Sequence, residues 1–149
     1  MAKMIAYSLT VLLFLFHSLS PSAIAQKTDT LSWYDTRYLE VEGKGWTETK
    51  SFYDRLPAKA EAVVREPVWN LSRYSAGMCV RFVTDAGEIQ ARWELRLKNL
   101  AMPHMPATGV SGLDLYVKGT NEKWKWLAVG RPLQFPVNSV TLGKDIPKG

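Results

Sequence analysis

The clearest pattern in this chain is a strict alternation of apolar and polar residues over positions 89–97. Five apolar side chains, among them Trp93 and Leu95, alternate with four polar ones. In a β-strand, this period of two places the apolar groups on one face and the polar groups on the other. A helix would scatter the same residues around its circumference, so the pattern predicts a half-buried strand.

A second apolar run, at positions 78–84, directly precedes the alternating run and places Val80 and Phe82 on one side of an extended chain. The connecting segment contains Gly87, which can supply the positive φ that a tight turn needs. The two runs are therefore predicted to form a β-hairpin.

Two further runs, at 113–118 and 124–131, flank a turn-forming segment at 119–122. They predict a second β-hairpin, with aromatic residues on its returning strand. Shorter strands are expected at 33–41 and at 139–142.

Two irregular stretches, at 52–75 and 99–111, separate these runs and are rich in proline. Positions 58–64 can form one or two helical turns, but Pro57 and Pro67 on either side favour a loop. Short strands, closely spaced turn signals and the absence of alternating strands and helices predict an all-β chain folded as an antiparallel β-sandwich.

The N-terminus has the pattern of a cleavable signal peptide. One positive charge, Lys3, precedes an apolar run of twelve residues at 5–16, and small residues end at Ala25, so that Gln26 would begin the mature chain. The apolar run is shorter than the roughly twenty residues of a spanning helix, so no stable membrane anchor is expected. The pattern predicts a periplasmic or extracellular protein.

Removal of residues 1–25 leaves residues 26–149, a length that suits one domain with a core of its own. The formal net charge of +5 is spread along the chain, and an exported chain is not expected to meet nucleic acid. Cys79 is the only cysteine, so an intramolecular disulfide is excluded. We interpret Cys79 as a small buried residue of a strand, with a reactive thiol as the alternative.

Candidate chemistry is sparse. His104 is the only histidine after cleavage, Thr108 and Ser111 are nearby hydroxyl groups, and Asp114 can orient a base. Such a set often arises by chance and Ser111 is not in a G-x-S-x-G elbow, so no catalytic residue is predicted. One histidine and one cysteine without ligand spacing predict no metal site, and no cofactor motif is present.

Aromatic residues are frequent, with six Trp and six Tyr. Trp124 and Trp126 alternate with Lys123 and Lys125. If these indoles are exposed, they can stack on sugar rings while the lysines donate to hydroxyl groups. The alternative is that such large rings fill the core.

The segment Gly112-Leu113-Asp114-Leu115-Tyr116 resembles the G-x-D-L-Y signature of the N-terminal domain of a group of SGNH-type (GDSL-like) esterases and lipases. Supporting blocks occur in the same order along the chain, at 69–72, 75–77, 80–82, 102–109 and 124–126. The resemblance extends from about Trp33 to Pro132.

This resemblance implies a jelly-roll-like β-sandwich that precedes a catalytic SGNH domain in an exported hydrolase. Such enzymes deacylate esters, often acetyl groups on polysaccharides, and their catalytic residues lie in the later domain. None of those later blocks is present here, so no catalytic residue is carried over. The candidate structural or substrate-rim residues are His104, Thr108, Ser111, Asp114 and Tyr116.

Three functions remain open. The first is a non-catalytic accessory domain of an esterase acting on acylated carbohydrate, with the SGNH catalytic domain as its partner. The second is a stand-alone carbohydrate-binding module that uses exposed Trp and Tyr. The third is a truncated remnant without activity, because a sandwich would need a pairing strand after residues 140–142. We also expect Asp114 to accept hydrogen bonds from the preceding loop and so to hold His104 and Thr108.

Overall fold

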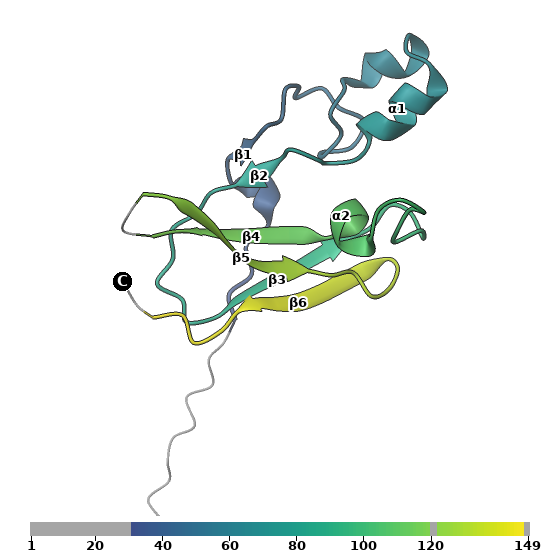
Figure 1. Cartoon of the computed structure of the whole chain (residues 1–149). Coiled ribbons are helices and arrows are strands. Elements are labelled where there is room, and N and C mark those ends of the chain that lie inside the picture. The colour runs from purple at the N-terminus through teal and green to yellow at the C-terminus, as the bar shows by residue number, and fades with distance from the viewer. Residues whose placement is uncertain (1–30, 120–121, 148–149) are drawn as a thin grey trace, which may run out of the picture.

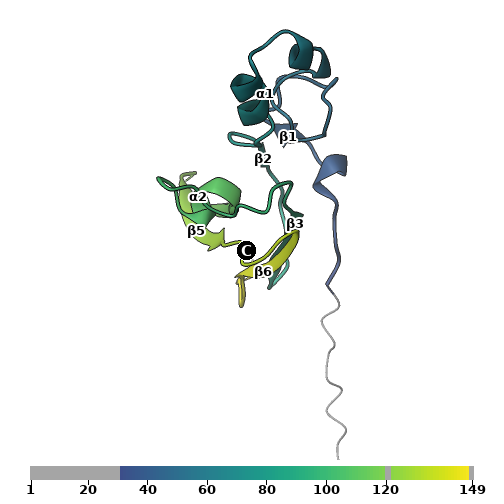
Figure 2. The ribbon, with the colours of Figure 1, turned by 90° about the vertical axis from the view of Figure 1, so that its right-hand side faces the viewer.

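The computed structural model describes residues 31–119 and 122–147. The predicted signal peptide, with its cleavage site between Ala25 and Gln26, lies outside these residues. A helical part that contains α1 lies at one end of the molecule, and the longer strands form the rest (Figures 1 and 2).

The strands form three antiparallel pairs, which confirms a strand-rich antiparallel chain. The pairs are β1 (Val41–Glu42) with β2 (Cys79–Val80), β3 (Ile89–Glu94) with β6 (Val137–Gly143), and β4 (Leu113–Lys118) with β5 (Trp124–Gly130). Strand β5 lies beside β6 and thereby brings the two longer pairs together (Figure 1).

The predicted hairpin of 78–84 with 89–97 is wrong. Val80 pairs with Val41, and β3 pairs with β6 instead. Gly87 does not adopt a positive φ, and its carbonyl accepts a hydrogen bond from the Ile146 amide at 3.0 Å. The connecting segment is therefore held by the C-terminal part of the chain, and it does not turn β2 back onto β3.

The second predicted hairpin is confirmed, because β4 and β5 pair along their length. The strand expected at 139–142 is also confirmed and is longer, as β6. The strand expected at 33–41 is reduced to Val41–Glu42. It is preceded by a 3₁₀ helix, η1 (Thr36–Tyr38), whose N-cap Asp35 accepts a hydrogen bond from the Arg37 amide at 2.9 Å.

The alternation in β3 is reproduced in its burial. Ala91 and Trp93 are half-buried, whereas Arg92 and Glu94 are exposed. A side chain added at Gly130 of β5 would meet Trp93 and two apolar residues of β6, so this glycine lies where the two longer pairs pack together. The sequence pattern therefore identifies the face of β3 that turns toward the interior.

Three short helices occupy stretches that were expected to be loops, namely η2 (Ala58–Ala62), α1 (Glu66–Ser72) and α2 (Ala107–Ser111). Pro67 lies in the first turn of α1, where its missing N–H leaves no helical hydrogen bond unmade. Pro57 and Pro106 are the N-cap residues of η2 and α2. The prolines therefore begin these helices and do not prevent them.

Several of the buried side chains lie in the helical part. Trp69 is 6% exposed and Asp54 only 2%. The Asp54 carboxylate accepts from the Ser51 amide at 2.9 Å and pairs with the Arg73 guanidinium at 3.3 Å, which compensates its burial. Cys79 is exposed, contrary to prediction, and it lies in the two-residue strand β2.

Candidate functional site

The G-x-D-L-Y segment begins where α2 ends and β4 starts. A Cβ at Gly112 would lie 2.4 Å from the Thr108 carbonyl oxygen and 2.8 Å from that of Gly130. Only a residue without a side chain permits this approach of α2 and β5. The first residue of the segment therefore allows α2 to lie against the start of the hairpin (Figure 1).

The third residue of the segment, Asp114, is exposed, and its Oδ1 accepts a hydrogen bond from Nε1 of Trp126 at 3.2 Å. No bond joins Asp114 to His104 or Thr108 in the described part of the chain. The expectation that this carboxylate holds the preceding loop is therefore replaced by a bond across the hairpin. Asp114 fixes an indole ring of β5.

Beside this bond lies an open hollow of about 280 Å³. It is lined by Thr108 and Gly109 of α2, Asp114 of β4, and Trp126 and Val129 of β5. The hollow therefore combines an indole, a hydroxyl group and a carboxylate. Two of the predicted rim residues, Thr108 and Asp114, meet here.

Two other candidates, the imidazole of His104 and the hydroxyl group of Ser111, do not line this hollow. His104 is exposed in the turn closed by the pairing of Met102 with Met105. Ser111 is half-buried, and its backbone carbonyl accepts a hydrogen bond from Nε1 of Trp93 at 2.9 Å. The described residues contain no hydrogen bond between His104, Ser111 and Asp114, so they form no assembled triad.

The aromatic candidates of the hairpin are all at the surface. Tyr116, Trp124 and Trp126 are 52%, 49% and 57% exposed. The alternative in which these rings fill the core does not apply to them. Trp69 and Trp93 have that role, and Arg81, whose guanidinium carbon lies 5.6 Å from the Trp124 ring centroid, is a neighbour that the sequence alone did not reveal.

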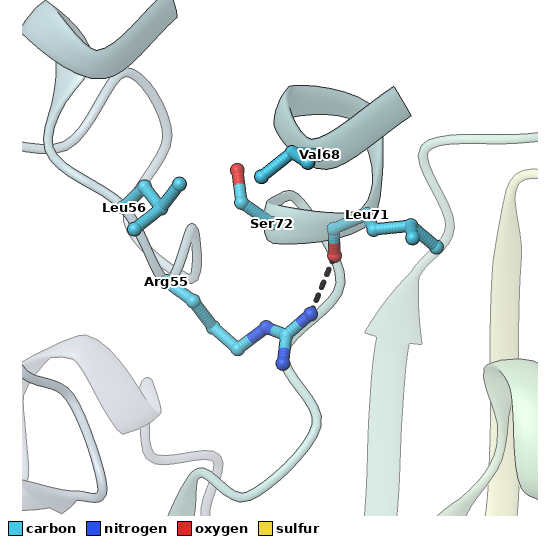
Figure 3. A pocket seen from close by; sticks show the side chains of 5 residues that line it. All are labelled: Arg55, Leu56, Val68, Leu71 and Ser72. Atoms are coloured by element: carbon cyan, nitrogen blue, oxygen red, sulfur yellow. Dashed lines mark hydrogen bonds between the residues drawn. The ribbon is translucent and has the colours of Figure 1, made fainter. Parts of the chain in front are cut away.

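A second hollow lies in the helical part, between α1 and the segment before η2 (Figure 3). Its lining is almost entirely apolar, with Leu56, Val68 and Leu71 around it. Arg55 at its rim donates to the Leu71 carbonyl at 2.7 Å, as the dashed line in Figure 3 shows. The guanidinium group thus joins the segment before η2 to α1, and the hollow brings together no acid–base pair.

Metal and membrane features were sought in residues 31–119 and 122–147. These residues contain no group of three or more His, Cys, Asp or Glu side chains placed to hold a metal ion. None of their helices has both the length and the apolar character to cross a membrane.

Fold and site together define a small strand-rich domain with an aromatic outer face. Residues 31–148 match the GxDLY family, described as the N-terminus of SGNH-hydrolase-type esterases, and the chain belongs to this family. The fold is similar to the crystal structure of a candidate GDSL-like lipase from Bacteroides ovatus ATCC 8483, with a TM-score of 0.68 and 25% sequence identity over 76% of this chain. The chain covers 33% of that protein. No curated protein matches the sequence.

Proposed function

We propose that this chain is the non-catalytic N-terminal accessory domain of an exported SGNH-type esterase that acts on acylated carbohydrate. The family match supports the accessory role. The signal-peptide pattern of residues 1–25 supports export to the periplasm or the extracellular space. The packing of the end of β5 at Gly130 against Trp93 of β3 and Val140 of β6 supports a jelly-roll-like sandwich.

The observation that carries this proposal is a rigid apolar loop before β6. Asn138 is only 5% exposed, and its side chain is bonded entirely to the backbone of this loop. Its Oδ1 accepts from the amides of Leu133 and Gln134, at 2.8 and 3.1 Å, and its Nδ2 donates to the Gln134 carbonyl at 2.8 Å. A buried amide therefore fixes the backbone of a surface loop.

This loop and the first residue of β6, Val137, display apolar side chains to solvent. Leu133 is 79% exposed, and Phe135 and Val137 are each about two-fifths exposed. We call these three residues the apolar loop. Complete burial of one such side chain contributes roughly 1.5–3 kcal/mol, and a loop already held in place loses little entropy on binding. The apolar loop is thus prepared to pack against another domain, for which we propose the SGNH catalytic domain.

A chimera tests this proposal. This chain would replace the matched third of the Bacteroides ovatus protein, ahead of the remaining two thirds. We expect both parts to unfold in one shared thermal transition, because the interface couples them. Leu133→Glu with Phe135→Glu should split this transition in two, since two carboxylates would be buried without partners.

The control is Val63→Glu. Val63 is 83% exposed and lies at the C-cap of η2, far along the chain from the apolar loop. This variant should keep the single transition. Independent unfolding of the two parts in the unmodified chimera, or an equal effect of Val63→Glu, would overturn the proposal.

A further inference from the structure

The outer face of the β4–β5 hairpin carries three aromatic rings in a row. Strand pairing places Tyr116 opposite Trp126 and Lys118 opposite Trp124. Residues paired across two strands point to the same side of a sheet, so the three rings share one face. We call Tyr116, Trp124 and Trp126 the aromatic strip.

A bulge in β5 places Trp126 on the same face of the hairpin as the carboxylate of Asp114. The register shifts between Leu115 and Tyr116, so that Leu127 is the extra residue of β5. Without this shift, Trp126 would share a face with Ala128, which pairs with Leu115 and is half-buried. With it, Trp126 lies on the face of Asp114, as their hydrogen bond confirms.

Two polar contacts hold the rings in position without covering them. Asp114 accepts from the Trp126 indole, and the Arg81 guanidinium lies over the Trp124 ring. Both indoles nevertheless keep about half of their surface exposed. Rings fixed in advance lose little conformational freedom when a ligand stacks on them.

The hollow beside Trp126 adds hydrogen-bonding groups to this stacking surface. Thr108 carries a hydroxyl group, and Asp114 has a second carboxylate oxygen, Oδ2, with no hydrogen-bond partner among the residues that the structure describes. Gly109 also lines the hollow and has no side chain, so the wall at this position is backbone. With a volume of about 280 Å³, the hollow can hold a single small ring.

We propose that the aromatic strip and this hollow form a binding site for a neutral carbohydrate chain. A sugar ring has an apolar C–H face, which can stack on an indole, and hydroxyl groups at its edge, which can donate to Asp114 Oδ2 and exchange hydrogen bonds with Thr108. Asp114 would repel the carboxylate of a uronic acid placed in the hollow, so the hollow favours neutral or acetylated units. The choice of this ligand class rests on the proposed function.

Binding of carbohydrate to the purified full chain tests this site. A glycan array of neutral oligosaccharides, each present with and without O-acetyl groups, identifies a bound probe, and isothermal titration gives its Kd. We expect binding to at least one neutral probe and none to uronic-acid oligosaccharides. Trp126→Ala should weaken binding about tenfold, Trp124→Ala should weaken it less, and Trp126→Phe should retain part of it.

The matched control is Trp46→Ala, which removes an indole that is 50% exposed but lies in the segment between β1 and η2. This variant should bind like the unmodified chain, and circular dichroism would verify that each variant folds. Absence of binding to every neutral probe, or equal weakening by Trp46→Ala and Trp126→Ala, would overturn the proposal. So would a Trp126→Ala chimera that separates its thermal transitions while binding glycan normally, because the strip would then be a domain interface.

The glycan-binding proposal and the accessory-domain proposal are tested by separate measurements, so either can be overturned without the other. Glycan binding is measured on this chain without a catalytic domain, whereas coupled unfolding is measured on the chimera without glycan. Loss of coupling in the Leu133→Glu, Phe135→Glu chimera with glycan binding unchanged supports both.

Discussion

At the scale of single residues, Gly112 is a position where the structure leaves no space for a side chain. Its missing side chain leaves space for two carbonyl oxygens, those of Thr108 and Gly130, which belong to different elements. Asp114, two residues later, then meets Trp126 across the hairpin. Both the stability of the α2–β4 junction and the position of the outer indole therefore depend on this short segment.

Gly112→Ala should destabilise the fold by about 1–3 kcal/mol, because backbone atoms must move apart to admit the new methyl group. Urea denaturation of the purified chain measures this change. Gly45→Ala is the control, since no atom lies within 4 Å of the added Cβ, and it should change stability by less than about 0.5 kcal/mol. Equal effects of the two substitutions would show that the Gly112 environment has been misassigned.

At the scale of elements, an ion pair joins the segment before η2 to that helix. Lys50 Nζ donates to both oxygens of Glu61, at 2.7 and 2.8 Å. This hydrogen bond from Lys50 lowers the pKa of Glu61 below its usual value. Because both side chains are almost half exposed, water screens the pair and its stabilisation is small.

The sign of its pH dependence follows from the lowered pKa of Glu61. The pair stabilises the folded chain above the pKa of the unfolded carboxyl group, roughly 4.3, and this contribution is lost as the pH falls through the lower folded pKa. Lys50→Ala should raise the pKa of Glu61 toward its usual value, as measured by NMR titration of its side-chain carboxyl. Lys59→Ala, in η2 itself, should leave the titration unchanged, and a response to both variants would argue against a specific pair.

The elements that were predicted correctly are those that local sequence controls. The β4–β5 hairpin needs only neighbouring runs and a turn, and the inner face of β3 is visible in its alternation. The partner of β3 was not predictable in this way, because β6 lies far along the chain and the choice depends on the apolar residues that meet around Gly130. In the candidate site, exposure of Trp124 and Trp126 was one of two alternatives left open. The Asp114–Trp126 bond was not foreseen, since it depends on a one-residue bulge.

At the scale of the whole molecule, exposed large apolar side chains far outnumber buried ones among the described residues. Apart from Gly130, the buried apolar residues in the described part of the chain are Trp69, Pro57 and Pro132. The apolar loop and the aromatic strip lie at the surface, and we assign them to different partners. Neither surface brings a nucleophile into contact with a base.

The isolated chain should therefore not hydrolyse p-nitrophenyl acetate above the rate in buffer. Ser111 has no hydrogen-bonded histidine to activate it, so Ser111→Ala should leave the background rate unchanged. A spectrophotometric assay of nitrophenolate release measures both proteins. Turnover that disappears in Ser111→Ala would show that this chain is itself an esterase.

The pairing of β3 with β6 also sets when this protein can fold. Ile89 pairs with Gly143 and Glu94 with Val137, so this strand pair closes only after residue 143 has been synthesised. Contacts between distant segments form slowly, because a long loop must be ordered before they contribute any stability. Strand β3 therefore has no partner until residues 137–143 have been synthesised, so the strand pair that contains Trp93 is completed late in folding.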